Sequence, residues 1–273
     1  MCGFAGEARF DSSTADIGAV ARMGEVLQPR GPDASGALQQ GGIALAHRRL
    51  RIIDLSETAQ QPMTDPGLGL TVVFNGCIYN YRELRRELEA LDYRFFSDGD
   101  TEVVLKSFHA WGRDCVNRFH GMFAFAIFER DSGRLTLARD RFGIKPLYLA
   151  EDKGRLRFAS SLPALLAGGD IDTAIDPAAL HHYMSWHAVV PPPLTLLAGP
   201  GAGRPARRRS RADGRRLASH RGAPPDGGRR AGRRAALGRR GFQPDRGLAG
   251  RGRPARPAHL LDRLRGRRRR IGR

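Results

Sequence analysis

The chain has 273 residues and a formal net charge of +18, and this length is enough for one large hydrophobic core or two modest ones. Residues 1–200 hold 21 Lys and Arg against 24 Asp and Glu, whereas residues 201–273 hold 25 Arg against four Asp. The first 200 residues are therefore ordinary and slightly acidic in composition, which excludes a strongly basic nucleic-acid-binding domain over that range.

The same composition indicates a compartment. The sequence contains no run of about eighteen apolar residues and no basic leader before an apolar stretch, so we expect neither a membrane span nor a signal peptide. Its three cysteines, Cys2, Cys77 and Cys115, are odd in number and lack metal-ligand spacing. They favour a reducing, cytoplasmic compartment and no metal site.

The first half of the chain predicts a mixture of helices and strands. Apolar residues recur at helical spacing over 16–28, 81–91 and 101–112, with Leu84, Leu88 and Leu91 on one face of the second helix. Residues 41–56 predict a strand pair that enters a loop, and 70–76 predict a short buried strand.

The second half predicts hairpins. Strands over 122–129 and 134–140 flank an Asp-Ser-Gly turn, and strands over 146–151 and 155–160 flank an Asp-Lys-Gly turn. A helix is expected over 177–189, before a run of three prolines. Two layers of antiparallel strands with helices outside satisfy this pattern, so the predicted fold class is α+β.

The chain changes character near Gly199. Beyond that point no periodicity remains, Lys and Glu are missing, and Phe242 is the single aromatic residue. Such a segment buries too little apolar surface to offset its chain entropy. We therefore expect an ordered domain over residues 1–198 and a disordered, Arg-rich tail over 199–273.

The opening sequence MCGFAG points to a particular chemistry. Methionine aminopeptidase removes Met1 when the second residue is small, and Cys2 would then carry a thiol and a free α-amine. An α-amine has a pKa near 7.7–8.0, so at neutral pH part of it can accept the thiol proton. One residue would supply nucleophile and general base, as in N-terminal nucleophile (Ntn) hydrolases. The alternative is a small residue that happens to follow Met1.

Nine stretches in a fixed order give the chain a family resemblance. The sequence resembles the glutamine amidotransferase domain of glutamine-hydrolysing asparagine synthetases, and the resemblance covers residues 1–198. It implies an Ntn fold, a four-layer αββα sandwich, with L-glutamine as substrate and no cofactor in this domain. The matching stretches are MCGFAG, RGPDASG, AHRRLRIIDLS, QQPM, FNGCIYNY, GDTEVVL, GMFAFAIF, RDRFGIKPLY and FAS.

The resemblance assigns roles residue by residue. Cys2 matches the nucleophile, and Asn75 and Gly76 match the oxyanion hole, where a glycine lets the backbone approach the substrate closely. Arg49 matches the residue that pairs with the substrate α-carboxylate, and Asp100 matches the carboxylate that holds its α-ammonium. Without the motifs, Arg49 could be a strand-surface charge and Asp100 a helix N-cap.

The chain departs from the family at two places. It has NGCIYN where the family has NGEIYN, so Cys77 replaces a glutamate that helps to bind the substrate amine; alternatively, Cys77 is a small buried filler. NGCIYN together with HAVVPPP resembles the N-acetylglutaminylglutamine amidotransferase branch, which amidates a dipeptide rather than aspartate. Ser161 stands where the family has a glutamate near its second domain, which puts coupling between the domains in doubt.

The second domain of the family is not legible in this chain. In asparagine synthetases it uses ATP and Mg²⁺ and carries an SGGxDS loop that binds pyrophosphate. Dropping the first nucleotide of the Leu237 codon lets residues 237–245, LGRRGFQPD, be read as SGGVDSSLI. We interpret the tail as an out-of-frame replacement of the synthetase domain, arising near Gly199, so that the ammonia-acceptor domain is missing.

Two alternatives from other classes stay open. A genuine Arg-rich tail would bind nucleic acid in a salt-dependent way, although it lacks Lys and aromatic residues for base stacking. The ordered domain could instead belong to another Ntn amidotransferase, such as glucosamine-phosphate synthase or amidophosphoribosyltransferase. The stretch HRRLRIIDLS and the shifted SGGVDSSLI argue against both enzymes.

Overall fold

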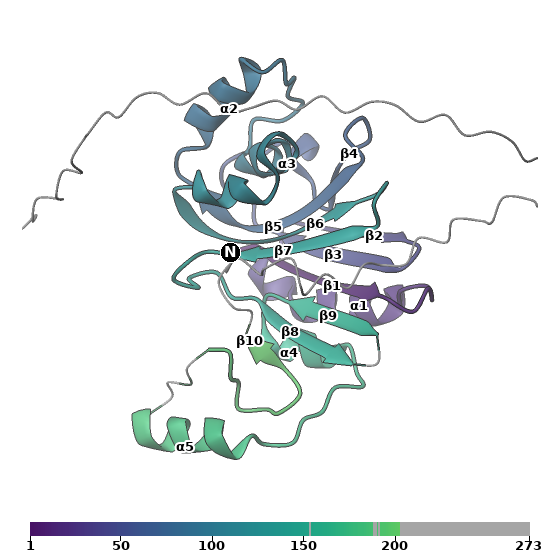
Figure 1. Cartoon of the computed structure of the whole chain (residues 1–273), viewed down its shortest axis with the longest axis vertical. Helices are drawn as coiled ribbons and strands as arrows, with labels where there is room; N and C mark the ends of the chain where they lie inside the picture. The colour runs from purple at the N-terminus through teal and green to yellow at the C-terminus, as the bar shows by residue number, and fades with distance from the viewer. Residues whose placement is uncertain (153, 188–189, 191, 203–273) are drawn as a thin grey trace, which may run out of the picture. The chain divides into compact units, whose positions relative to one another are not determined.

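A computed structural model describes residues 1–152, 154–187, 190 and 192–202. These residues belong to one compact unit, Met1–Arg221, and a second unit, Gly222–Arg273, lies outside them. The described residues form four layers, in which helices cover the outer faces of two stacked antiparallel sheets (Figure 1). The predicted fold, an α+β four-layer αββα sandwich, is confirmed.

The larger sheet contains the N-terminal strand at its centre. Its strand order is β10-β8-β9-β1-β3-β2, so that β1 pairs with β3 on one side and with β9 on the other. The strands are β1 (Gly3–Arg9), β2 (Ala34–Gln40), β3 (Ile43–Arg49), β8 (Tyr148–Asp152), β9 (Arg155–Ala159) and β10 (Gly201–Ala202).

The smaller sheet is a meander with the order β4-β5-β6-β7. Its central pair runs for nine residues in each strand, and Asn75 lies opposite Ala124. The strands are β4 (Met63–Asp65), β5 (Leu70–Ile78), β6 (Gly121–Glu129) and β7 (Arg134–Arg139). The hairpin predicted around Asp131-Ser132-Gly133 is β6 and β7.

Two groups of helices close the sandwich. Helices α2 (Tyr81–Glu89) and α3 (Asp100–Trp111) pack on the smaller sheet, and α1 (Ile17–Val26) and α4 (Leu162–Ala167) pack on the larger one. Short 3₁₀ turns occupy Gln28–Arg30, Glu57–Ala59 and Gly112–Asn117. Each helix pair contributes apolar side chains to its own core, and a third core fills the space between the sheets.

Strand alternation decides which side chains face the space between the sheets. On β1, Phe4 and Ala8 lie in the inter-sheet core, whereas Ala5 lies in the core under α1 and α4. On β5, Val73 lies in the inter-sheet core, whereas Phe74 faces α2 and α3. Because side chains alternate with period two, even positions of β1 and odd positions of β5 face the same space.

Two predictions made from local patterns are wrong in detail, and one strand was not predicted. Residues 41–56 form one strand, β3, followed by a loop, rather than a strand pair. Leu91 lies beyond the end of α2 and is 55 % exposed, so it does not share the buried face of Leu84 and Leu88. The segment 3–9 carried no strand signal, yet it is the central strand of the larger sheet.

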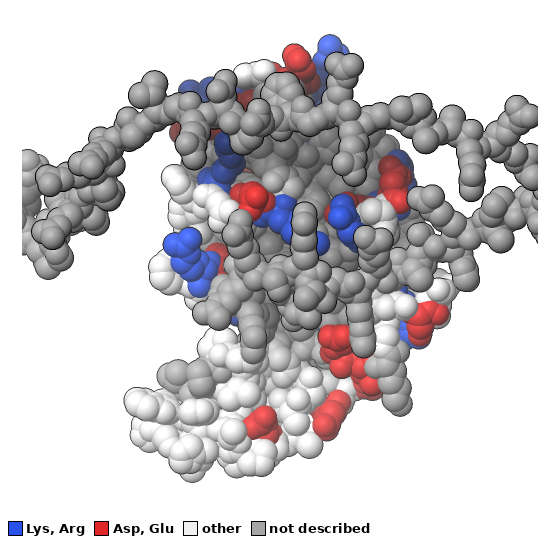
Figure 2. All heavy atoms as spheres, viewed as in Figure 1, with Lys and Arg blue, Asp and Glu red and all other residues white. Residues whose placement is uncertain are grey.

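The last helix lies apart from both helix pairs. Helix α5 (Pro177–Trp186) begins at an Asp176 N-cap, and its surface is largely free of charged side chains (Figure 2). Met184 and Trp186 are 67 % and 68 % exposed. No described helix combines the length and apolar character needed to cross a membrane. Disorder was predicted for residues 199–273. Of these, residues 203–273 lie outside the described part of the chain.

Candidate functional site

Figure 1 shows the N-terminus beside the two stacked sheets, and Cys2 follows it directly. Cys2 precedes β1 on its even-numbered face, Arg49 ends β3, and Asn75 and Cys77 lie on the odd-numbered face of β5. Ile43 and Leu45 of β3 lie in the inter-sheet core, so Arg49 shares their face. Three strands from two sheets therefore bring these side chains to one space between the sheets.

The thiol of Cys2 is half-buried and rests against the turn that follows β3. The backbone N–H of Leu50 donates to Cys2 Sγ over 3.3 Å, and Sγ lies 3.6 Å from the Leu50 carbonyl oxygen. The Cys2 carbonyl accepts from Arg30 Nε at 3.2 Å. The cysteine is thus held by backbone on one side and by a guanidinium on the other.

Arg49 is buried and directs its guanidinium into the loop that follows β3. Its two Nη atoms donate to the backbone carbonyls of Asp54 and Ser56. The same loop contacts the segment ahead of α3, because the carboxylate of Asp54 accepts from the Asp98 N–H at 2.8 Å. A guanidinium has five N–H donors, so these two bonds leave three N–H groups for a further partner. The strand-surface alternative for Arg49 is wrong, since only 4 % of the residue is exposed.

Asn75 supplies a buried donor without a partner. The residue is 1 % exposed, and its Nδ2 has no hydrogen-bond acceptor among the described residues. An unpaired buried donor is costly, so it is typically found where a ligand completes the bond. The next residue, Gly76, leaves no space for a side chain, since a Cβ would lie 2.5 Å from the Met122 carbonyl oxygen. Packing on the helix side therefore also requires this glycine.

Asp100 is the first residue of α3 and connects that helix to β5. Its Oδ2 accepts from the Ile78 N–H at 3.0 Å. Burial raises the pKa of Asp100 to about 6, although the hydrogen bond from Ile78 opposes the shift. The N-cap position belongs to Gly99, so the N-cap alternative for Asp100 misses by one residue.

Cys77 lies close enough to Asp100 for the two charges to interact. Burial raises the pKa of the Cys77 thiol, the carboxylate of Asp100 raises it further, and the ammonium of Lys145 lowers it. The residue is half-buried rather than enclosed. The third cysteine, Cys115, is fully buried in the core under α2 and α3, where burial raises its pKa to about 12.

Two further cations stand beside Cys2, and sequence reasoning gave neither of them a role. Arg30 ends the 3₁₀ turn after α1, and Lys145 lies in the loop between β7 and β8. Burial lowers the pKa of Lys145 and the guanidinium of Arg30 lowers it further, whereas the nearby Cys2 and Cys77 oppose the shift. Both cations sit inside the quoted stretches RGPDASG and RDRFGIKPLY, but no spacing rule relates them to Cys2.

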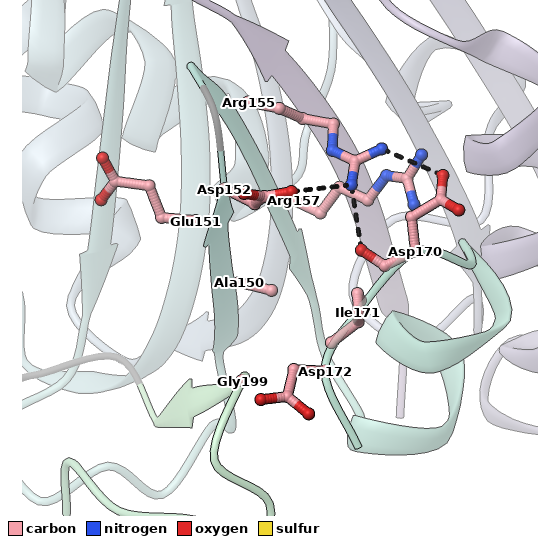
Figure 3. A pocket seen from close by; sticks show the side chains of 9 residues that line it. All are labelled: Ala150, Glu151, Asp152, Arg155, Arg157, Asp170, Ile171, Asp172 and Gly199. Carbon is pink, nitrogen blue, oxygen red and sulfur yellow. Dashed lines mark hydrogen bonds and ion pairs between the residues drawn. The ribbon is translucent and has the colours of Figure 1, made fainter. Parts of the chain in front are cut away.

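A pocket of about 290 Å³ opens elsewhere, against β8 and β9 (Figure 3). Figure 3 shows its charged walls joined to each other: Arg155 pairs with Asp152 and Asp170. Arg157, which also lines it, pairs with Glu7 of β1 at 2.7 Å. None of the predicted site residues lines this pocket. Both of its arginines are paired with carboxylates of the fold, and we do not take it as the candidate site.

Comparisons with known proteins identify the domain family. A model of the glutamine amidotransferase domain matches residues 1–211. The chain is 40% identical over 199 residues to asparagine synthetase [glutamine-hydrolyzing] 1 from Bacillus subtilis (strain 168), which covers 72% of this chain and 31% of the relative. It is 36% identical over 183 residues to asparagine synthetase [glutamine-hydrolyzing] 3 of the same organism, covering 66% of this chain and 30% of the relative.

A solved structure shares the fold. It is the glutamine phosphoribosylpyrophosphate amidotransferase from B. subtilis complexed with ADP and GMP, with a TM-score of 0.53 and 20% identity. The match covers 62% of this chain and 44% of that chain, and it bears on the fold alone. The chain spans about a third of the length of the curated relatives that it matches.

Proposed function

Because the chain belongs to the glutamine amidotransferase domain family, we propose that it hydrolyses L-glutamine to glutamate and ammonia through a thioester on Cys2. The observation that carries the proposal is the unpaired amide of Asn75, buried on the same inter-sheet face as Cys2. A nucleophilic thiol and an unpaired, buried N–H donor that face the same space are the groups that amide hydrolysis requires.

The reaction begins with removal of Met1, which frees the α-amine of Cys2. That amine takes the thiol proton, and Sγ attacks the side-chain amide carbon of glutamine. The oxygen of the tetrahedral intermediate accepts from Asn75 Nδ2 and from the Gly76 N–H. The C–N bond then breaks as the α-ammonium returns its proton to the leaving ammonia. Water, deprotonated by the same amine, cleaves the thioester and releases glutamate.

Substrate binding falls to the charged residues around this centre. Arg49 binds the α-carboxylate with its remaining N–H donors, and Asp100 binds the α-ammonium as a buried carboxylate. Cys77 lies beside Asp100 and contributes no charge as a thiol. The direct test is release of glutamate and ammonia in equal amounts from glutamine by the 273-residue chain. Absence of both products from a chain that lacks Met1 would refute the proposal.

The activity of the whole protein is proposed from the same family. We propose that a second domain, which this frame does not encode, uses the released ammonia. That domain would amidate aspartate or a related carboxylate, such as N-acetylglutaminylglutamine, in a reaction that depends on ATP and Mg²⁺. The exposed apolar surface of α5 supports a missing neighbour. No ATP-dependent step is assigned to this chain. An intact mass near 30 kDa, less one methionine, from the native host would show that the chain is translated in this frame, and a mass about twice as large would show that the tail is an artefact of reading.

Replacing Cys77 with glutamate tests the first departure from the family. We expect Cys77→Glu to lower the glutamine KM about 3- to 10-fold, because a second anion beside Asp100 strengthens the attraction for the substrate ammonium. Steady-state kinetics at pH 7.5 measures the effect. Cys77→Gln, which has the same size without the charge, is the matched control. An unchanged KM in Cys77→Glu would identify Cys77 as a filler of space.

The raised pKa of Asp100 predicts pH-dependent substrate binding. The carboxylate forms only above its pKa of about 6, so the Kd of glutamine should be constant above pH 7 and rise about tenfold per unit below pH 6. Calorimetry on the Cys2→Ala variant separates binding from turnover. The folded chain also holds this proton more tightly than the unfolded chain, so stability falls as pH rises from about 4 to 6.

Asp100→Asn supplies the control for that prediction. It should abolish the pH dependence of binding, weaken binding at pH 7.5, and raise the free energy of unfolding there by as much as about 3 kcal/mol. The exposed neighbour Asp98 offers a matched variant, Asp98→Asn, which should leave the binding profile unchanged. If Asp100→Asn binds glutamine as well as the parent chain at pH 7.5, Asp100 does not hold the ammonium.

A further inference from the structure

The loop between β7 and β8 is clamped so that it presents Lys145 at one fixed place. The buried carboxylate of Asp140 accepts from the backbone N–H groups of Ile144 and Lys145, both at 2.9 Å. Arg139 donates through Nε to the Lys145 carbonyl at 2.9 Å and through Nη2 to that of Gly143 at 2.6 Å. Gly143 has a φ of +66°, a conformation that glycine adopts at least cost.

The side chain of Lys145 is buried beside the N-terminus with an unusual partner. The residue is 3 % exposed, and within the described part of the chain no carboxylate lies at ion-pair distance from its ammonium. Its Nζ donates instead to the thioether Sδ of Met1 at 2.8 Å. A thioether is a weak acceptor, and an ammonium buried without an anion is costly. Once Met1 is removed, the ammonium loses even this partner.

Covalent geometry limits how far Lys145 lies from the nitrogen of Cys2. Five bonds separate Met1 Sδ from that nitrogen, so the two atoms are at most about 6 Å apart. Added to the Nζ–Sδ distance of 2.8 Å, this places the ammonium within about 9 Å of the Cys2 nitrogen. A unit charge at that distance, in an effective dielectric of about 20, shifts a pKa by about one unit.

We propose that Lys145 is a positioning residue that keeps the α-amine of Cys2 unprotonated at neutral pH, so that the amine can accept the thiol proton. The inference rests on the proposed function, since it requires removal of Met1. A fixed cation beside the amine disfavours the ammonium form and favours the thiolate. An anion paired with the ammonium would cancel this effect.

Other charged groups near Cys2 and Lys145 also affect the protonation of the α-amine. Arg30, from the turn after α1, donates to the Cys2 carbonyl and adds a second cation. The carboxylate of Asp140, in the loop itself, and Cys77 of β5, when ionised, act on Lys145 with the opposite sign. The carboxylate oxygens of Asp140 accept hydrogen bonds from four backbone N–H groups, so Asp140 positions the loop rather than pairing with the ammonium of Lys145.

The test is the pH profile of kcat/KM for glutamine hydrolysis between pH 5.5 and 9.5. We expect Lys145→Met to move the acid limb up by about one unit, with an approximately tenfold loss at pH 6 and less than a twofold loss at pH 9.5. Lys145→Arg keeps the charge and should keep the limb. Arg141→Met removes an exposed charge from the same loop and should change nothing. An unmoved limb, or an equal loss at every pH, overturns the inference, as does failure of Lys145→Arg to restore the limb.

A measurement on the parent chain covers the case in which Lys145→Met does not fold. NMR titration of the ¹⁵N-labelled α-amine of Cys2 should give a pKa below the ordinary 7.7–8.0, and a value of 8 or more overturns the inference. The proposed function fails separately. If intact mass shows that Met1 is retained, or if Cys2→Ala still releases ammonia, the proposed function is refuted. If the enzyme depends on Cys2 but the acid limb of its pH profile does not move in Lys145→Met, only the role of Lys145 is refuted.

Discussion

Cys2→Ala is expected to lower glutamine hydrolysis about 10⁴- to 10⁶-fold, the loss typical of removing a catalytic nucleophile. The substitution is selective. Alanine is as acceptable as cysteine to methionine aminopeptidase, so the variant keeps its free α-amine and loses only the thiol. The thiol makes its contacts with the Leu50 backbone, so the fold should tolerate the change. Glutamate release, followed by a coupled assay, measures the effect.

Cys115→Ala is the matched control for the nucleophile. It removes a thiol that is enclosed in the core under α2 and α3, so activity should persist while the free energy of unfolding falls by about 1 kcal/mol. Residual hydrolysis above about 1% of the parent rate in Cys2→Ala would show that another group attacks the amide.

Asn75→Ala is expected to lower kcat about 10²- to 10³-fold, which corresponds to about 2.7–4 kcal/mol of lost transition-state stabilisation. The KM should change less than twofold, because the oxyanion exists only after attack. Since Asn75 Nδ2 has no acceptor among the described residues, truncation breaks no hydrogen bond of that nitrogen. The free energy of unfolding should therefore stay within about 1 kcal/mol of the parent value.

Steady-state kinetics and chemical denaturation together decide that prediction. Asn117→Ala, at an exposed position before β6, is the matched control and should leave both quantities unchanged. A rise in KM at constant kcat would mean that Asn75 binds ground state and transition state equally. A stability loss as large as the activity loss would mean that the amide supports the fold instead.

The fold was predictable where local pattern and tertiary environment agree. The alternation and turn residues of 122–140 specify the β6–β7 hairpin, because one face packs inward and the turn glycine, Gly133, has a φ of +64°. Strand β1 gave no such signal. Two of its seven residues are glycine, and Gly6 is required because a Cβ there would meet the Phe158 ring at 2.3 Å. That reason exists only once β9 is paired beside β1.

The candidate site was predictable to a similar degree. Motif resemblance selected Cys2, Arg49, Asn75, Gly76 and Asp100, and strand register explains how the side chains of three of them, Cys2, Arg49 and Asn75, converge. Sequence could not reveal that Arg49 spends two donors on its own loop, or that Asn75 keeps an unpaired one. No sequence pattern indicated a role for Lys145, and the reason is physical. Its contact with Met1 spans 144 residues of chain and forms only when the two sheets stack.

Because β1 is a central strand, it cannot be fully paired until late in synthesis of the chain. The strand needs β3 on one side and β9, which ends at Ala159, on the other. At about 5–20 residues per second, a ribosome takes about 8–30 s to extend the chain from β1 to β9. During that interval the amino terminus is accessible to an aminopeptidase. In the folded chain Met1 is still 56 % exposed, but Arg30 holds the Cys2 carbonyl, so we expect an aminopeptidase to remove Met1 more slowly after folding than before it.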